Sequence, residues 1–407
     1  MHREPAGIGV ISTYERVARD ADPSLHSEGR HAAKATAATP TPSPEILWGY
    51  LATCLTMTAV LHTADVHLTA DTRERMDALR TLLDHAETNS FDVVTIGGDL
   101  FDRPEAVERL RTDLRNDLFS NRSFDIVLIP GNHDVEAYRG DVFFGDSCTV
   151  ITDEPFEHWT APDENLRITG LPYREYPDDD LLLALQDRDP FDGAEVLLLH
   201  CSLDAPFDDH ETGAEETRRY FPVTEELLAE LGFDYYLAGH YHSAHKVSFS
   251  NGGEFTYPGT PASTSTAETG QRRVSILDPE RGIDFETLQT FHYVEREFTA
   301  TPGAEAELLD TVRAWAEQHV RESVDASIQV TGFIEMEEEA FHEALTSAAS
   351  PAAVTNQTRS VEYILAHPLF RSFEDELEET DWDDETKAQV SHRTLDVFSE
   401  LTARGEM

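Results

Sequence analysis

The feature that most constrains this sequence is a pair of short apolar runs that each end at glycine and are followed at once by polar side chains. Residues 93–96 precede Gly-Gly-Asp99, and residues 126–129 precede Pro-Gly-Asn132-His133. Runs of this length, rich in valine and isoleucine, are typical of strands buried on both faces. Open α/β sheets hold their sites at the carboxyl ends of such strands. We therefore expect Asp99 and Asn132 to lie together at one sheet edge.

Three further apolar runs end in side chains of the same kind: Asp65-Val-His67, a single histidine at position 200, and His240-Tyr-His242. The five runs together supply seven candidate metal ligands, which are Asp65, His67, Asp99, Asn132, His200, His240 and His242. One such motif alone is ordinary turn chemistry, but five in succession indicate a metal site. Seven ligands exceed the needs of one ion and fit two ions if Asp99 bridges them. Oxygen and imidazole ligands of this kind suit Mn²⁺, Mg²⁺ or Fe.

The order of these motifs resembles that of the calcineurin-like metallophosphoesterases: Asp-x-His, Gly-Asp-x-x-Asp, Gly-Asn-His-Asp, His and Gly-His-x-His. The resemblance implies two sets of metal ligands, one made of Asp65, His67, Asp99 and His242, and the other of Asp99, Asn132, His200 and His240. It also implies that His133 is the catalytic acid and that Asp102 orients it. The chemistry agrees, because a histidine that directly follows a ligand is well placed to protonate a leaving oxygen.

The segment Gly-Asp-Leu-Phe-Asp-Arg103-Pro, taken with Pro-Gly-Asn-His-Asp, is similar to the DNA double-strand-break repair nucleases of the SbcD type. This resemblance covers roughly residues 57–335. It implies an exo- or endonuclease that uses Mn²⁺, carries a βαβ cap and ends in helices that bind a coiled-coil SMC-like ATPase. DNA and that ATPase are the expected partners. The sequence does not decide between a monomer and a homodimer. Arg103 either contacts a substrate phosphate or caps its loop.

Two other functions compete with a nuclease. The first is a phosphatase or phosphodiesterase acting on small-molecule phosphoesters, although a compact enzyme of that kind would not need a second domain. The second is a non-catalytic scaffold, which the complete ligand set and the intact His133 disfavour. The chain also lacks the usual basic stripe of a DNA-binding protein, since arginines are paired in or near the main domain only at 218–219 and 272–273.

The net charge of the chain is extreme, with 79 acidic and 31 basic residues and a formal charge of −48. A hydrophobic content of 40% nevertheless argues for a folded core rather than disorder. We expect a halophilic protein whose carboxylates are solvated in molar salt, where the screening length is about 3 Å and repulsion of DNA largely disappears. Three cysteines without a spacing motif predict a reducing, cytoplasmic setting. Residues 46–64 carry no charge and mimic a signal-peptide core, but they lead into the strand before Asp65, and no other stretch approaches a membrane span.

Composition divides the chain into four expected regions. Residues 1–56 are expected to be a disordered or misassigned N-terminal extension, because they include an Ala/Thr/Pro/Ser-rich segment. Residues 57–290 are expected to form the metallophosphoesterase domain, an α/β fold of two sheets packed as a sandwich. Residues 291–345 are expected to form a small cap-like βαβ domain, and 346–407 an acidic helical tail. Within the main domain we expect a helix at about 72–89 with Asp71 as its N-cap.

Overall fold

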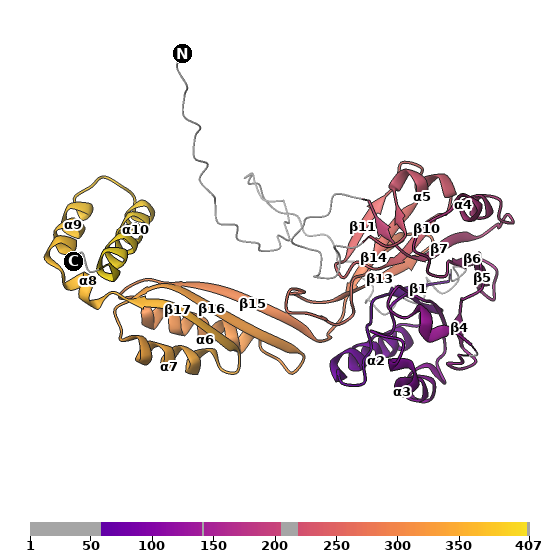
Figure 1. The fold of residues 1–407 in the computed structure, drawn as a ribbon, viewed down its shortest axis with the longest axis horizontal. Helices are drawn as coiled ribbons and strands as arrows, with labels where there is room; N and C mark the ends of the chain where they lie inside the picture. The colour runs from indigo at the N-terminus through magenta and orange to yellow at the C-terminus, as the bar shows by residue number, and fades with distance from the viewer. Residues whose placement is uncertain (1–57, 141, 205–218, 405–407) are drawn as a thin grey trace, which may run out of the picture. The chain divides into compact units, whose positions relative to one another are not determined.

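The computed structural model describes residues 58–140, 142–204 and 219–404, and the following account concerns these residues (Figure 1). The N-terminal region 1–56, which we expected to be a disordered or misassigned extension, lies outside them, as do residues 205–218.

The first sheet has six strands in the order β14-β13-β1-β2-β3-β4. Its parallel part consists of β1 (Val60–Thr63), β2 (Val93–Gly97), β3 (Asp125–Ile129) and β4 (Cys148–Val150). An antiparallel hairpin of β13 (Arg273–Asp278) and β14 (Gly282–Thr287) joins it at β1. Every residue of β1 and β2 is buried, as expected for central parallel strands.

The second sheet also has six strands, in the order β11-β12-β10-β7-β6-β5. Its parallel part consists of β12 (Glu254–Tyr257), β10 (Tyr235–Gly239), β7 (Ala194–His200) and β6 (Leu166–Gly170). The edge strands β11 (His245–Ser248) and β5 (Glu157–Thr160) run antiparallel to their neighbours. A short parallel pair, β8 (Ser202–Leu203) with β9 (Pro222–Val223), follows β7.

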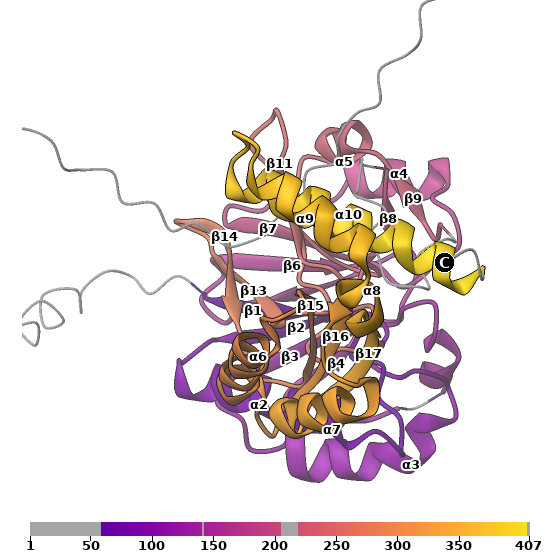
Figure 2. The same ribbon diagram turned by 90° about the vertical axis from the view of Figure 1, so that its left-hand side faces the viewer.

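The two sheets pack face to face, and helices cover their outer faces (Figures 1 and 2). The first sheet carries α2 (Arg73–Thr88), α3 (Ala106–Asp113) and the π-helical turn η1 (Leu114–Phe119). The second carries α4 (Asp179–Gln186) and α5 (Glu225–Leu231). The predicted two-sheet α/β sandwich is therefore confirmed. The predicted cap of α2 is wrong, because Thr72 occupies the N-cap position and its side chain makes no capping bond.

A buried histidine ties the two sheets together beneath the ends of their strands. His62 on β1 is fully buried, with Nδ1 2.9 Å from Thr95 Oγ1 on β2 and Nε2 3.1 Å from the carbonyl oxygen of Ala238 on β10. The carbonyl can only accept, so Nε2 carries the hydrogen and donates it. Burial lowers the pKa of His62 to about 4, which keeps the ring neutral. This bridge fixes the spacing of β1, β2 and β10.

The C-terminal part forms a parallel three-stranded sheet in the order β15-β16-β17. The chain runs through β15 (His292–Ala300), α6 (Glu305–His319), β16 (Val324–Ile334), α7 (Glu338–Ala349) and β17 (Ala353–Ser360). Val312 of α6 and Phe341 of α7 pack on Ile328 and Val330 of β16, so both helices cover one face (Figure 1). The expected βαβ unit is thus extended by a helix and a strand, and the boundary expected at residue 345 falls within α7.

Three helices follow this sheet: α8 (Glu362–Ala366), α9 (Pro368–Glu378) and α10 (Asp384–Ala403). Val361, Ile364, Phe370 and Leu395 form their small core together with Phe333 of β16. The tail expected from residue 346 is helical from 362 onward, with β17 ahead of it. Within the described ranges, no helix combines the length and the apolarity that a membrane crossing requires.

A charged cluster stabilises the second sheet at the end opposite to His200. Arg188 donates to the carbonyl oxygens of Leu185 and Leu231 (both 2.8 Å), and its Nη2 lies 2.8 Å from Glu195 Oε2. Burial raises the pKa of Glu195, but hydrogen bonds from Arg188 and Arg167 outweigh it and hold the pKa below 4.5. Because the folded-state pKa is the lower one, this stabilisation is complete above about pH 4.5 and is lost as the pH falls further.

We predict that Arg188→Met lowers the free energy of unfolding by about 2–3 kcal/mol, because carbonyls and a carboxylate lose a charged donor. The matched control is Arg73→Met, which removes an ion pair to Asp77 whose two side chains are 87% and 52% exposed. That change should cost less than about 1 kcal/mol. Urea unfolding at constant salt measures both values. Equal costs for the two variants would contradict the structural role assigned to Arg188.

Candidate metal centre

The seven predicted ligands come from five strand ends that meet where the two sheets adjoin. Asp65 and His67 follow β1, Asp99 follows β2, and Asn132 follows β3. His200 is the last residue of β7, and His240 and His242 follow β10. Ligand atoms of Asp65, His67 and His242 all lie within 4.8 Å of one another, as do those of Asp65, Asp99 and His200. The two groups share Asp65, so they lie side by side.

The two remaining predicted ligands join the second of these groups. Asn132 Oδ1 lies 2.9 Å from Nε2 of His200. His240 packs its ring 5.5 Å from that of His200, centroid to centroid, and its backbone N–H donates to both carboxylate oxygens of Asp65 at 3.1 and 3.0 Å. The structure therefore brings all seven predicted ligands into one site.

Four of these ligands have backbone conformations that L-residues rarely adopt. The φ angle is +54° at Asp65, +49° at His67, +51° at Asp99 and +113° at His240. Such conformations cost free energy and persist at functional sites where the surrounding structure enforces them. Here the enforcing bonds are between loops: the N–H groups of Asp65 and His67 donate to the carbonyl oxygens of Gly98 (3.1 Å) and Asp99 (2.9 Å).

Glycine is required at two positions because the loops approach one another too closely for a side chain. A Cβ atom at Gly131 would lie 2.2 Å from Oδ1 and 2.6 Å from the backbone nitrogen of Asp99. Gly98 has φ +99°, and a Cβ there would lie 2.4 Å from Nδ1 of His200. The glycines of the two motifs therefore permit the contact between the loops that carry Asp99, Asn132 and His200.

The hydrogen bond that His200 makes through Nδ1 leaves its other ring nitrogen, Nε2, facing two side-chain oxygen atoms. Nδ1 lies 2.8 Å from the carbonyl oxygen of Gly97, which can only accept, so Nδ1 carries a hydrogen. Nε2 lies 2.9 Å from Asn132 Oδ1 and 3.3 Å from Asp99 Oδ2. In a neutral ring these three atoms would present lone pairs to one another. Either a proton or a cation must lie among them, and a divalent ion suits this nitrogen and oxygen set.

The charges of the site depend on one another. Burial lowers the pKa of His200, but the carboxylate of Asp99 outweighs it and raises the pKa to about 9. Burial raises the pKa of Asp99, yet His200 holds it below its usual range. Burial also raises the pKa of Asp65 to about 6, against the opposing effect of His200. The site therefore concentrates buried negative charge that needs positive charge beside it.

His67 and His242 face one another on the other side of Asp65. Their Nε2 atoms are 3.1 Å apart, a distance that suits two nitrogens directed at a common ion as well as a hydrogen bond. Burial lowers the pKa of His67 to about 3, so this ring is neutral and can offer a lone pair. The donor set thus fits a second divalent cation.

The predicted acid, His133, lies beside this group and contacts the loop of Asp102. Its backbone N–H donates to Asp99 Oδ1 at 2.9 Å, and its ring stands edge-on to His67 at 4.9 Å. Nδ1 lies 3.2 Å from the backbone carbonyl oxygen of Asp102. The Asp102 carboxylate instead lies against Arg75 (3.4 Å) and Arg103 (3.1 Å). The bond that orients His133 thus runs to the backbone of Asp102.

Three residues that the sequence analysis did not select support the site. Asp134 is buried and accepts hydrogen bonds from the N–H groups of Gly131 (2.8 Å) and Phe101 (3.1 Å), which join the two ligand loops. Arg75 donates to the carbonyl oxygen of His67 at 2.6 Å. Glu268 accepts from Nδ1 of His242 at 2.8 Å. Only Asp134 carried a sequence signal, since it completes the Gly-Asn-His-Asp motif; the other two come from a helix and a distant turn.

Two arginines noted in the sequence, Arg272 and Arg103, differ in their exposure. Arg272 is 8% exposed and donates to the carbonyl oxygens of His242 (2.6 Å) and Thr260 (3.0 Å), so it supports the ligand loop. Arg103 is 75% exposed beside Asp102, a position compatible with either of its expected roles.

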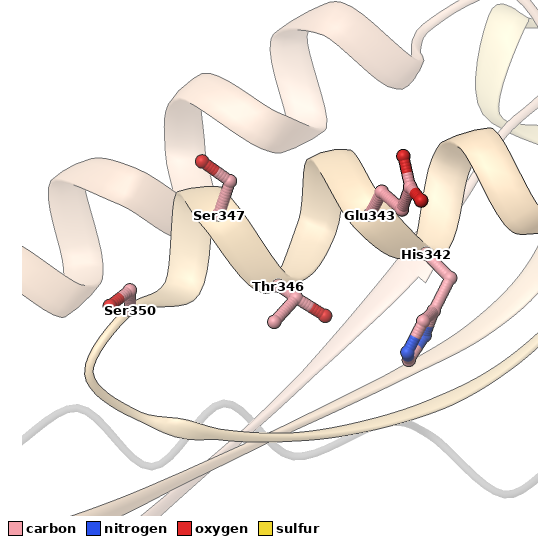
Figure 3. Close-up of a pocket in the computed structure, with 5 residues that line it drawn as sticks. All are labelled: His342, Glu343, Thr346, Ser347 and Ser350. Atoms are coloured by element: carbon pink, nitrogen blue, oxygen red, sulfur yellow. The ribbon is translucent and has the colours of Figure 1, made fainter.

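A hollow of about 590 Å³ lies elsewhere, on α7, and is lined by His342, Glu343, Thr346, Ser347 and Ser350. Figure 3 shows that Glu343 and Ser347 point away from His342 and Thr346. Because the polar groups diverge along one helix, this surface does not resemble the convergent ligand set of the strand ends.

Comparison with known proteins agrees with the geometry. Residues 58–244 match the family model of the calcineurin-like phosphoesterases. These residues form a calcineurin-like phosphoesterase domain. The match contains all seven predicted ligands together with His133, and members of this family use two divalent metal ions. A search of curated proteins finds no match to the sequence.

Two solved structures of phosphatases align with part of this chain. A dimetal phosphatase from Danio rerio aligns with 14% identity and a TM-score of 0.40, covering 57% of this chain and 96% of that protein. A purple acid phosphatase from yellow lupin (Lupinus luteus) seeds aligns with 13% identity and a TM-score of 0.40, covering 58% of this chain and 53% of that protein.

We predict that Gly131→Ala weakens metal binding by about tenfold or more, the effect typical of disturbing a ligand's support, because the new methyl group displaces Asp99. Metal content by mass spectrometry after dialysis against Mn²⁺ measures the loss. Gly252→Ala is the control, since a Cβ there meets no atom within 4 Å, and its φ of +96° makes it a test of backbone strain without contact with a ligand. Full metal content in Gly131→Ala would show that Asp99 is not needed at its present position.

Proposed function

We propose that this protein hydrolyses phosphodiesters with two divalent cations, of which Mn²⁺ is the first choice and Mg²⁺ or Fe the alternatives. The observation that carries the proposal is the convergence of seven nitrogen and oxygen ligands from five strand ends. Asp65, His67, Asp99 and His242 would hold one ion, and Asp99, Asn132, His200 and His240 the other. When bound, two such ions polarise a phosphoryl oxygen and neutralise the charge that develops in the transition state.

His133 supplies the proton that the leaving oxygen needs. In the proposed step water attacks phosphorus and gives up one proton to the solvent. The bond between phosphorus and the leaving oxygen breaks, and that oxygen takes a proton from the protonated ring. The bond from Nδ1 to the carbonyl oxygen of Asp102 fixes the ring, so that Nε2 is the nitrogen that gives up its proton. The Asp102 carboxylate would act less directly, through Arg75 and its own loop.

DNA is the substrate that we favour. The motif Gly-Asp-Leu-Phe-Asp-Arg103-Pro is similar to that of repair nucleases, and none of the proposed ligands lies beyond His242. The unit from β15 to β17 and the helices after it are therefore available to hold DNA or to bind an SMC-like ATPase. By holding a DNA end near the cations, these elements would contribute to the rate through orientation of the substrate, which is separate from acid–base catalysis.

A small-molecule phosphoester is the second candidate, and the charge of the protein favours it. A net charge of −48 repels a polyanion in dilute buffer far more than it repels a small phosphoester. In molar salt this difference nearly vanishes, since the screening length falls to about 3 Å.

We predict that His133→Asn retains both Mn²⁺ ions and loses about 10²–10⁴-fold in hydrolysis of an alkyl phosphodiester, the usual contribution of a general acid. A p-nitrophenyl ester should lose much less, because its leaving group needs no proton. Metal counting and the two rates test the role. An equal loss of rate with both leaving groups, or the loss of a metal ion, would show that His133 is not the general acid.

We also predict that the intact protein with Mn²⁺ cleaves DNA, and that cleavage rises from low to molar KCl as the acidic surface is screened. The assay offers single- and double-stranded DNA together with bis(p-nitrophenyl) phosphate across one salt series. If the protein in molar KCl hydrolyses the small ester rapidly and leaves every form of DNA intact, the nuclease hypothesis is wrong. The small-molecule phosphoesterase is then the remaining function.

A further inference from the structure

Glu268 contacts a ligand side chain of the metal centre although it lies beyond residue 244, where the family match ends. Its Oε1 lies 2.8 Å from Nδ1 of His242, and both side chains are buried. We infer that Glu268 is a positioning residue for the metal centre: it holds His242 in the orientation and tautomer that present Nε2 to a cation. The inference rests on the proposed metal centre and is independent of whether DNA is the substrate.

The hydrogen bond decides which nitrogen of His242 carries the proton. A carboxylate can only accept, so Nδ1 must donate to Glu268. Nε2 of the neutral ring then carries a lone pair instead of a hydrogen. This atom lies 3.1 Å from Nε2 of His67. Carboxylates in this position raise the basicity of a ligand histidine and fix its ring, which strengthens metal binding.

Glu268 is itself held firmly, so that it can impose an orientation on His242. Its second oxygen, Oε2, accepts from the backbone N–H of Thr264 at 2.8 Å and from Thr260 Oγ1 at 3.0 Å. Two residues further on, the N–H of Gly270 donates to the carbonyl oxygen of Tyr293 at 2.8 Å, so β15 anchors the segment. The carboxylate cannot turn away without breaking these bonds.

Glu268→Gln tests the inference because it keeps the shape of the side chain while it removes the charge and changes the hydrogen-bonding pattern. The N–H of Thr264 must still donate, so the amide oxygen turns toward Thr264 and the NH₂ group toward His242. Nδ1 then has to accept, which places the proton on Nε2, the atom that would bind metal. We expect Glu268→Gln to lose about 10–100-fold in affinity for one of two Mn²⁺ ions.

The experiment is calorimetric titration of the metal-free full-length protein with Mn²⁺, together with its thermal unfolding temperature. Thr260→Val is the matched control: it removes the bond to the other oxygen of the same carboxylate and a bond from Arg272, but it leaves the bond between Glu268 and His242. Glu195→Gln controls for losing a half-buried carboxylate far from the site. Both controls should bind two Mn²⁺ ions with wild-type affinity, even where they unfold at a lower temperature.

Two results would overturn the inference. In the first, Glu268→Gln binds both ions as tightly as the wild-type protein, so the proton on His242 is not set by Glu268. In the second, Glu268→Gln and Thr260→Val lose affinity equally, so the carboxylate only holds its loop together. Wild-type protein that binds no Mn²⁺ would be a different failure, because it would overturn the proposed metal centre and the inference with it.

Discussion

The arrangement of the site depends on Asp99, whose carboxylate and backbone oxygen together contact three other strand ends. Oδ1 accepts from the backbone of His133 after β3, Oδ2 lies 3.3 Å from His200 on β7, and the backbone oxygen of Asp99 accepts from His67 after β1. These contacts join loops from both sheets around one buried charge. They also need the tight approach of Gly131 and the positive φ angle of Asp99 itself. A residue of another shape or charge at position 99 would therefore disturb several ligands together.

The sequence predicted the parts of this arrangement that are local. An apolar run followed by glycine and a polar side chain fixes the end of a buried strand, and parallel strands align their carboxyl ends, so the ligands could be located without coordinates. Glu268 could not be found in this way, because its contact with His242 depends on how the turn after β12 folds back. The hydrogen bond from His133 to the backbone of Asp102 could not be predicted either. A sequence motif identifies candidate side chains but not the backbone carbonyl groups to which they bind.

The C-terminal unit shows a second limit of sequence patterns. β16 alternates apolar and polar residues, which is the sequence pattern of a half-buried strand, whereas β17 reads Ala-Val-Thr-Asn-Gln-Thr-Arg-Ser and has few apolar residues. Its residues alternate between exposed and half-buried, and it is a strand because it pairs with β16 over eight residues, from Ser327 with Ala353 to Ile334 with Ser360. Strand propensity depends strongly on such neighbours, so a polar edge strand gives little signal on its own.

The same buried charges that define the site also make cations part of its stability. Asp65 and Asp99 are almost wholly buried, and burial raises the pKa of Asp65 to about 6, which means that its charged form is disfavoured there. The backbone at both residues is held at positive φ, which adds a further cost. His200 compensates for part of this negative charge with its own proton. Divalent cations would compensate for more, and because the unfolded chain has no such site, the free energy of binding them would also stabilise the fold. The ligand loops are therefore better explained as a binding site than as a self-sufficient structural core.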